Sequence, residues 1–419
     1  MIGAIADDVT GATDVAVAFR RQGLCAGIYF GVPDAGTIDS NLEAVVIALK
    51  SRTIPVESAV VQTLAAARAL KAAGARQLYF KYCSTFDSTP AGNIGPVLDA
   101  LVELTETDSV VTTPSSPEHG RTVYNGYLFV NGLLLAESHM RNHPLTPMKE
   151  SSLVLLMDAQ TPSGSTSSTI GHDVVRQGPA AIVSAIQAAR TGARYLFPDA
   201  ITDDDLLAIA RAVIDEPLVA GAAGLAGALA RAKVEQQGGL ASLNEEELPA
   251  GNAVVLAGSC SRRTLEQIEH MHRDGRPAFR LDALECQDPA TLAQEALIWF
   301  DALPDGDAPL IYSSLPPAEL HEVQETLGVE RSADILETAI AEVAQELRKR
   351  GVTRFIAAGG ETSGSIVNAL GVSGGIIGPE AARGVPWIHT AQGLDVLLKS
   401  GNFGEPDLLV AASSDRKGK

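Results

Sequence analysis

The sequence has few cysteines, no long apolar run and no basic residues at its beginning. Its four cysteines stand singly, without a CxxC pair or a metal-ligand spacing to the eight histidines, so we expect reduced structural thiols. No stretch reaches the roughly 18 uninterrupted apolar residues of a membrane-spanning helix. The first residues, MIGAIADDVTG, place carboxylates where a secretory signal has basic residues. These absences predict a cytoplasmic protein with no membrane partner.

Positive charge is scarce as well. The chain has 32 lysines and arginines against 51 aspartates and glutamates, which gives a formal net charge of −19. Such a charge argues against nucleic acid or an anionic membrane as a partner. An anionic nucleotide would therefore need local lysines, arginines, backbone amides or Mg²⁺ to bind to this chain.

Two common nucleotide-binding motifs are missing. No predicted strand is followed by GxGxxG, and the nearest glycine run, Gly221, Gly224 and Gly227, has the wrong spacing. The absence of GxxxxGK followed by Ser or Thr excludes a P-loop kinase but not other enzymes that use ATP. A nicotinamide-dependent dehydrogenase of a sugar acid is thus disfavoured and remains an alternative.

Hydrophobic residues are abundant, at 46% of the 419 positions, and aromatics make up only 5%. Strand-like and helix-like segments alternate, with strands predicted at Ile2 to Ala6, Ala44 to Ala48 and Gln77 to Lys81 and helices at Thr13 to Gln22 and Val56 to Ala73. This alternation predicts an α/β fold in which mainly parallel sheets are covered by helices. Because single cores stop growing at about 250–300 residues, we expect two such domains.

A polar stretch from Gln236 to Ala250 lacks periodic apolar residues and predicts a linker. It separates an N-terminal domain, residues 1–235, from a C-terminal domain, residues 251–419, in which the strand–helix alternation starts again. A second polar stretch, Gln160 to Ser168, consists of small residues and predicts a surface loop.

The motif ADDVTGATD follows the first predicted strand. Ligands of open parallel sheets bind beyond the carboxyl ends of the strands, so Asp7, Asp8, Thr10 and Asp14 stand at the expected rim. One of these carboxylates could instead cap the helix that follows, but capping does not account for two in sequence. We predict Asp8 as a catalytic carboxylate that accepts a proton.

Two later segments offer cations and hydroxyl groups. The sequence KYCSTFDST follows a predicted strand and supplies Lys81 with short polar groups, a mixture that suits a polyhydroxy acid, although a solvated turn has the same composition. In HGRTVYNGY, Arg121 is the natural carboxylate clamp because its planar fork binds bidentately. His119 beside it reads either as a general base or as a hydrogen-bonding loop residue.

Three glycine-rich or serine-rich loops lie in the C-terminal half: GSCS from Gly258, GGETSG from Gly359 and KSGNFG from Lys399. A glycine-rich turn that leads into a helix offers free N–H groups and a positive dipole end to a phosphate. Two glycine-rich turns that merely cap helices would look similar, but three such loops in one domain favour a nucleotide site. Lys399 is predicted to neutralise phosphate charge, as lysines do in other kinases.

Taken together and in order, these segments resemble the four-carbon acid sugar kinase family over nearly the whole chain. KYCSTFDST and KSGNFG are similar to its 3-oxo-tetronate kinase branch. Val9 and Ala223 depart from residues common in the family, Phe and Ser. The resemblance implies a sugar-acid-binding N-terminal domain, a nucleotide-binding C-terminal domain and ATP-dependent phosphorylation of the 4-hydroxyl of a 3-oxo-tetronate, with D-threonate or D-erythronate as alternative substrates.

The expected ligands are thus a small sugar acid, ATP and Mg²⁺, with the metal ligands and a homo-oligomer left open. The predicted sugar-acid-binding residues are Asp7, Thr10, Lys81, Ser84, Asp87, Ser88 and Arg121. The predicted ATP-binding residues are Ser259, Ser261, Gly360, Glu361, Thr362, Ser363, Gly401 and Gly404.

Overall fold

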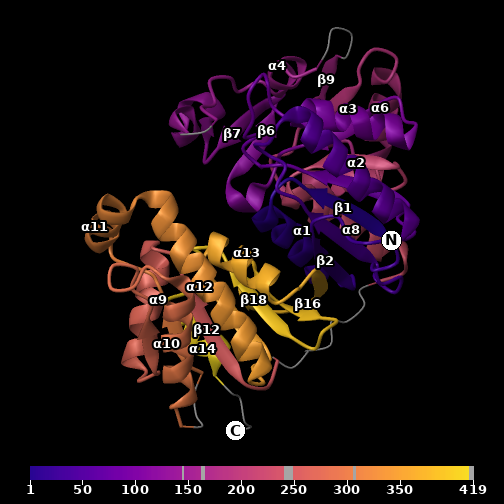
Figure 1. Ribbon diagram of the computed structural model, residues 1–419. Helices are drawn as coiled ribbons and strands as arrows, with labels where there is room; N and C mark the ends of the chain where they lie inside the picture. Colours follow the sequence, from indigo (N-terminus) through magenta and orange to yellow (C-terminus); the bar gives the residue numbers. More distant parts are fainter. Residues whose placement is uncertain (144–145, 162–165, 240–248, 305–307, 415–419) are drawn as a thin grey trace. The chain divides into compact units, whose positions relative to one another are not determined.

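The structure is a computed structural model that describes residues 1–143, 146–161, 166–239, 249–304 and 308–414. It separates into two compact units, Met1–Leu243 and Asn244–Lys419 (Figure 1). Each unit has a mainly parallel sheet covered by helices, which confirms the predicted α/β class. Most of the predicted linker 236–250 and the middle of the predicted loop 160–168 lie outside the described residues.

Among the described residues, eight parallel strands form the sheet of the first unit. Their spatial order is β2 (Ala26–Phe30), β3 (Ala44–Ala48), β1 (Ile2–Ala6), β4 (Gln77–Lys81), β11 (Leu218–Gly221), β5 (Val110–Thr113), β10 (Tyr195–Pro198) and β9 (Ser167–Ile170). Strand β1 lies between β3 and β4 in register, so that Ala6 is opposite both Ala48 and Lys81. The carboxyl ends of these three strands therefore meet at one edge.

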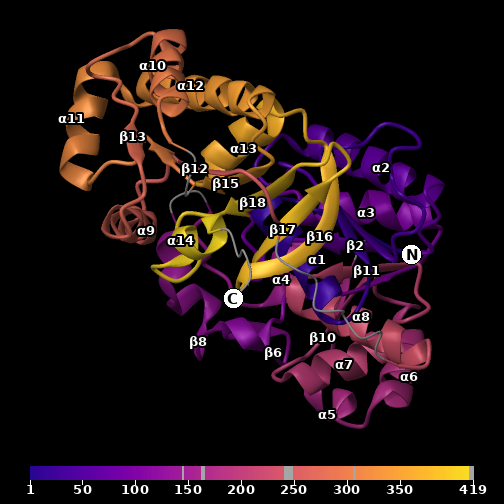
Figure 2. The ribbon, with the colours of Figure 1, turned by 90° about the horizontal axis from the view of Figure 1, so that it is seen from below.

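Helices cover both faces of this sheet. They are α1 (Val9–Arg21), α2 (Val56–Ala72), α3 (Ile94–Thr105), α4 (Leu153–Asp158), α5 (His172–Val175), α6 (Pro179–Ala189), α7 (Asp203–Ala212) and α8 (Ala223–Gln236). Figures 1 and 2 show α2 and α3 on one side of the sheet around β1 and α8 on the other, where α1 packs against it. Helix α1 begins at Val9, ahead of the predicted Thr13, because the Asp8 side chain caps it.

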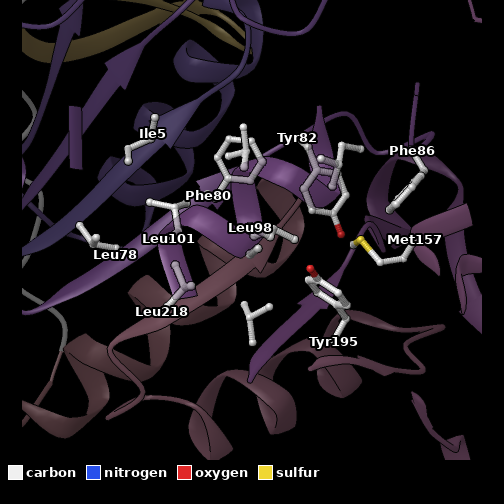
Figure 3. Packing of buried hydrophobic residues seen from close by; sticks show 14 of the residues in the cluster. Ile5, Leu78, Phe80, Tyr82, Phe86, Leu98, Leu101, Met157, Tyr195 and Leu218 are labelled. Atoms are coloured by element: carbon white, nitrogen blue, oxygen red, sulfur yellow. The ribbon is translucent and has the colours of Figure 1, made fainter. Parts of the chain in front are cut away.

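The main core of this unit lies between the sheet and the α2–α3 layer. Side chains from alternate positions of the strands, such as Ile5, Leu78 and Phe80, point toward Leu98 and Leu101 of α3 (Figure 3). All five are buried, with exposed fractions of 2% or less. This packing holds the strand ends in fixed positions, so that the polar loops after them are attached to a rigid support.

A small antiparallel sheet, absent from the sequence prediction, follows β5. It is made of β6 (Arg121–Tyr124), β7 (Tyr127–Val130) and β8 (Leu133–Leu134), with the short 3-10 helices η1 (Pro117–His119), η2 (Leu135–Glu137) and η3 (His139–Asn142) around it. Asn125 and Gly126 turn the chain between β6 and β7 with φ values of 50° and 72°. The carboxylate of the buried Asp199 accepts hydrogen bonds from both of their N–H groups and so fixes this hairpin.

In the part of the second unit that the structure describes, the sheet has five parallel strands and an antiparallel extension. The parallel strands are, in spatial order, β13 (Ala278–Arg280), β14 (Leu310–Tyr312), β12 (Ala253–Ala257), β15 (Arg354–Ala358) and β18 (Asp395–Lys399). Antiparallel to β18 runs β17 (Val385–Thr390), which pairs in turn with β16 (Gly374–Ala382). Its helices are α9 (Arg262–Arg273), α10 (Pro289–Asp301), α11 (Pro317–Leu327), α12 (Val329–Lys349), α13 (Gly360–Ala369) and α14 (Leu408–Ser413).

Two further predictions can be compared with the structure. The four cysteines all lie in described parts of the chain, and each is a free thiol there. Among the helices of the described residues, none has the length and apolar character needed to span a bilayer.

Candidate functional site

An ion network occupies the edge of the first sheet where β1, β3 and β4 end. The Arg52 guanidinium binds Asp7 through two bonds, Nε to Oδ2 at 2.9 Å and Nη2 to Oδ1 at 2.8 Å. Arg52 Nη2 also lies 2.5 Å from Asp8 Oδ1, and the Lys81 ammonium donates to the same oxygen at 2.7 Å. Two cations and two carboxylates from three neighbouring strands thus form one cluster, which we call the acid-site network.

Gly11 makes room for this network. A Cβ atom at Gly11 would lie only 1.6 Å from Lys81 Nζ, so the missing side chain is what allows the ammonium to reach Asp8. The Gly11 N–H donates to Asp8 Oδ2 at 3.2 Å, which makes Asp8 both the cap of α1 and a partner of Lys81. The capping interpretation and the functional interpretation of the ADD motif therefore apply to the same residue.

The charges of the network reinforce one another. Burial opposes ionisation of Asp8, but Lys81 and Arg52 outweigh it and lower its pKa to about 2. Burial would likewise lower the pKa of Lys81, yet the neighbouring Asp7 and Asp8 raise it. At neutral pH Asp8 and Lys81 are therefore both ionised, and their pairing fixes the position of the ammonium beside the candidate site.

Arg52, the centre of this network, was not predicted from the sequence. Arg52 lies four residues after the end of β3, at the edge of the sheet where Asp7 directly follows β1. The buried amide of Asn93 holds this loop by donating to the carbonyl oxygens of Ser51, Arg52 and Ile54 at 2.7, 3.2 and 3.0 Å. The polar run after the strand Ala44–Ala48 was the available signal, because adjacent parallel strands end at a common edge.

Asp87 lies near the network but outside its hydrogen bonds. Burial raises the pKa of Asp87, and the charges of His143 and Arg52 oppose that rise. His143 Nδ1 is 3.7 Å from Asp87 Oδ1. The preceding residue, Phe86, is fully buried and has a φ of 48°, a left-handed conformation that bulky residues rarely adopt. The loop after β4 is thus held in a strained shape beside the candidate site.

The other predicted sugar-acid residues are more dispersed. Ser88 is buried against Gly92, Ser84 is half-buried and Thr10 is exposed. Arg121 belongs to the small sheet, where its Nη1 donates to the carbonyl oxygen of His119 and its buried Nε has no hydrogen-bond partner among the described residues. The structure thus brings Asp7, Asp8 and Lys81 together with Asp87 near them and leaves Arg121 on a separate element.

The second unit has a comparable edge where β12, β15 and β18 end. Ala257 is in register with Ala358, and Ala358 with Lys399, so the loops after these strands begin side by side. The three predicted nucleotide motifs, which start at Gly258, Gly359 and Lys399, therefore lie next to one another. We call this region the glycine-rich edge.

One carbonyl group joins two of these loops. The Gly401 carbonyl oxygen accepts bonds from Ser261 Oγ at 2.6 Å, Thr264 Oγ1 at 2.9 Å and Lys399 Nζ at 2.8 Å. Lys399 also donates to Thr264 Oγ1 at 2.7 Å. Its side chain is fully buried, and burial, together with the charge of Arg263, lowers its pKa to about 8. Lys399 is thus no surface lysine, and Thr264 is a further partner that the sequence analysis missed.

Helix α13 presents the features of an anion site. Its cap, Gly359, has a φ of 137° and no side chain, and the first backbone hydrogen bond of the helix runs from the Ser363 N–H to the Gly359 carbonyl. The amides of Gly360, Glu361 and Thr362 precede that bond, in the first turn, where N–H groups have no partner within the helix. Ser363 Oγ is buried and has no hydrogen-bond partner among the described residues.

The glycines of this edge differ in what surrounds them. A Cβ atom at Gly401 would meet Ser259 Oγ at 2.7 Å, whereas one at Gly360 would have no heavy atom within 4 Å. Gly404 has a φ of 81°, and a Cβ there would meet Leu408 Cδ2 at 2.2 Å. Gly360 is therefore open to a ligand, whereas Gly404 serves the turn that leads into α14.

The comparisons with known proteins cover almost the whole chain. Residues 2–229 match the family model for a sugar-binding N-terminal domain and residues 254–409 the one for a nucleotide-binding C-terminal domain. A 3-oxo-tetronate kinase of Cupriavidus necator is 44% identical, with 98% of this chain and 96% of that protein aligned. A 3-oxo-tetronate kinase of Haemophilus influenzae is 42% identical, with coverages of 98% and 99%.

Solved structures agree with this match. A crystal structure from Salmonella typhimurium LT2 superposes with a TM-score of 0.90 at 39% identity, and one from Haemophilus influenzae with 0.88 at 40% identity. In both cases the likeness covers 98% of this chain and 98% of the other. The fold described above is thus shared with these proteins over nearly their whole length.

Proposed function

Because this chain belongs to the four-carbon acid sugar kinase family, we propose that it phosphorylates the 4-hydroxyl group of 3-oxo-tetronate with ATP, giving 3-oxo-tetronate 4-phosphate and ADP. The observation that carries the proposal is the match, over 98% of the chain, to relatives named 3-oxo-tetronate kinase at 42–44% identity. The contrast between an edge rich in charged side chains and an edge rich in glycine and hydroxyl groups supports it independently. An ATP-dependent reaction also fits the proposed cytoplasmic location.

We assign the sugar acid to the N-terminal domain, residues 1–235, and ATP to the C-terminal domain, residues 251–419. The acid-site network supports the first assignment, because a hydroxy acid needs both hydrogen-bond acceptors and cations. Arg121 and Lys81 remain the proposed carboxylate partners, with Arg52 added to them. Among the described residues Arg52 binds Asp7 and Asp8 through Nε and Nη2, and we propose that its Nη1 donates to the sugar acid.

For ATP, we propose that the first-turn amides of α13 receive phosphate oxygens, with the hydroxyl groups of Thr362 and Ser363 beside them. The free space at Gly360 and the unpartnered Ser363 hydroxyl support this position. Ser259 and Ser261 would line the same edge from the neighbouring loop. Lys399 would act mainly by holding the Gly401 loop and adding positive charge beneath it.

Mg²⁺ usually binds through substrate phosphates, waters and one or two carboxylates. Among the described residues, no three acidic, histidine or cysteine side chains form a group that could hold a metal by themselves. The carboxylates of Asp7 and Asp8 already accept bonds from Arg52 and Lys81. We therefore propose that Mg²⁺ is bound with the ATP phosphates, where Glu361 of the first turn of α13 offers a carboxylate and the ion supplies charge neutralisation.

The role of Asp8 follows from its contacts. Phosphoryl transfer needs an in-line hydroxyl group and charge neutralisation more than covalent chemistry by the protein. Asp8 holds the Lys81 ammonium in place, so its removal would disturb the cation as well as the acceptor. We propose that Asp8 contributes to catalysis chiefly by orienting Lys81 and the substrate.

The test is ADP release from purified protein supplied with ATP, Mg²⁺ and each of 3-oxo-tetronate, D-threonate and D-erythronate. We expect a kcat/KM for 3-oxo-tetronate that exceeds the other two, and a product whose phosphate is on the 4-oxygen by NMR. Preference for threonate or erythronate would move the protein to another branch of the family. Reduction of NAD(P)⁺ without ADP release would reject the kinase proposal.

A further inference from the structure

Transfer of the γ-phosphoryl group requires a destination for one proton. In the proposed reaction, a bond forms between the 4-oxygen of the acid and the γ-phosphorus, while the bond from that phosphorus to the β,γ-bridging oxygen breaks and ADP leaves. The hydroxyl proton of the acid must pass to an acceptor with a free lone pair. This inference rests on the proposed kinase function and concerns which side chain accepts that proton.

The two carboxylates at the end of β1 are heavily engaged. Asp8 Oδ1 accepts hydrogen bonds from Arg52 Nη2 at 2.5 Å and from Lys81 Nζ at 2.7 Å. Asp8 Oδ2 accepts one from the Gly11 N–H at 3.2 Å. Both oxygens of Asp7 accept from Arg52. A carboxylate that already accepts several charge-assisted bonds is a poor proton acceptor, because protonation would break those bonds.

Asp14 is placed differently on the same helix. It follows Gly11 by three positions in α1, and side chains three apart in a helix share a face. The missing side chain of Gly11 is where the Lys81 ammonium lies, so Asp14 continues that face one turn further along the helix. Asp14 is half-buried, and among the described residues only burial and neighbouring charges act on its carboxylate, without a hydrogen bond.

We propose that Asp14 is the proton acceptor of the reaction, while Asp8 positions Lys81 and the substrate. The division assigns the free carboxylate to proton transfer and the bound carboxylate to orientation. Asp8 holds the Lys81 ammonium in the space left by Gly11. Lys81 therefore lies against the face of α1 that also carries Asp14.

The electrostatics agree with this division. Burial raises the pKa of Asp14, and the negative charge of Asp8 adds to the rise, while Lys81, His119 and Arg21 oppose it. The pKa of Asp8 is lowered instead, so Asp14 is the stronger base of the two. Activity that depends on ionised Asp14 should therefore fall as the pH drops, and it should do so before Asp8 titrates.

The experiment compares Asp14→Asn, Asp14→Glu and the wild-type enzyme at saturating ATP and sugar acid. Asp34→Asn is the matched control, because it makes the same chemical change at an exposed position in a loop. We expect Asp14→Asn to lower kcat by about 10²-fold or more, with both KM values changed by less than about threefold and the melting temperature unchanged or slightly raised. Asp14→Glu should recover part of kcat and retain an acidic limb in the kcat–pH profile that Asp14→Asn lacks.

Two results would overturn the inference. One is an Asp14→Asn enzyme with kcat within about threefold of wild type; the other is a loss explained by a lower melting temperature that Asp14→Glu does not reverse. Failure of the proposed function looks different, because the wild-type enzyme would then release no ADP with any four-carbon acid. The Asp14 comparison is made with whichever of these acids the wild-type enzyme phosphorylates.

Discussion

The acid-site network and the glycine-rich edge both lie at the carboxyl ends of parallel strands, but they are made of different chemical groups. The edge of the first unit is made of charged side chains that pair with one another, Arg52 and Lys81 with Asp7 and Asp8. The edge of the second unit is made of backbone, hydroxyl groups and one buried lysine, Lys399. The difference indicates that strand ends supply a location, while the loops decide whether the location recognises a hydroxy acid or a phosphate chain.

The largest expected effect on the first edge comes from replacing Lys81. Replacing Lys81 with Met leaves Asp8 in a largely buried site without its main cation, and loss of one partner of a buried pair typically destabilises by about 3–5 kcal/mol. We expect the free energy of unfolding in urea to fall by roughly 3 kcal/mol, with kinase activity lost. Lys50→Met is the control, since Lys50 is exposed two residues after the end of the neighbouring strand β3. Equal stability of the two variants would contradict the network.

On the glycine-rich edge, the largest effect should come from Gly360→Val. The fold tolerates a side chain there because a Cβ atom meets nothing within 4 Å, so a defect would report on the ligand. We expect the ATP dissociation constant to rise by about 10²-fold in calorimetry while the melting temperature stays the same. Gly192→Val is the matched control, at a similarly open glycine in the first unit. Unchanged ATP affinity in Gly360→Val would contradict the assignment of ATP to the N-terminus of α13.

Replacing Arg121 or Arg52 tests whether the two ligands bind at separate sites. Arg121→Ala and Arg52→Ala should each raise the KM for the sugar acid, by about 30-fold for the residue that contacts its carboxylate, because losing a charge-assisted contact costs about 2 kcal/mol or more. The KM for ATP should change little in either variant. Steady-state kinetics with each substrate varied in turn makes the measurement. Equal shifts in both constants would contradict separate sites for the two ligands.

Acid should weaken the first edge through Asp8. Its pKa is lowered from 3.8 to about 2, so its contribution to stability is complete above pH 3.8 and is lost as the pH falls toward 2. We expect this group to account for roughly 2 kcal/mol of unfolding free energy over that range. Asp8→Asn should flatten this part of the stability–pH curve. An identical acid limb in wild type and variant would show that Asp8 is not stabilised by its cations.

The smallest expected effect concerns Lys399. Lys399→Met removes the donor that joins Thr264 to the Gly401 carbonyl, so the loop should bind ATP less tightly, by about tenfold. Wild-type ATP affinity should also decline as the pH rises through about 8, where Lys399 loses its proton, and the variant should lack that step. Wild-type turnover at saturating ATP in Lys399→Met would remove Lys399 from catalysis and leave it a purely structural role.

The sequence predicted the α/β class and the strands that carry both edges, because buried strands and amphipathic helices leave a periodic pattern. It did not predict the pairing of side chains across those edges. Asp7 and Arg52 are 45 positions apart, and Lys399 and Thr264 are 135 apart. Such contacts depend on strand order and register, and neither is encoded in local periodicity.

The small sheet around Arg121 illustrates a second kind of miss. The Asn125-Gly126 dipeptide is a strong hairpin signal, but the prediction for this segment rests on Arg121 and His119 alone. Helix α1 illustrates a third kind of miss, since its start depended on whether Asp8 faced the backbone or a ligand. In the structure the same carboxylate bonds to both Gly11 and Lys81. The predicted domain boundaries and site roles remain predictions.

The buried ammonium of Lys399 has a consequence for how the protein exchanges protons with its surroundings. Within the described chain no carboxylate pairs with it, and its pKa of about 8 means that a fraction of molecules carry it neutral in mildly alkaline solution. A polyphosphate bound above it would favour the charged form and draw a proton from the buffer. Nucleotide binding near pH 8 should therefore consume protons, and the apparent binding enthalpy should vary with the ionisation enthalpy of the buffer chosen.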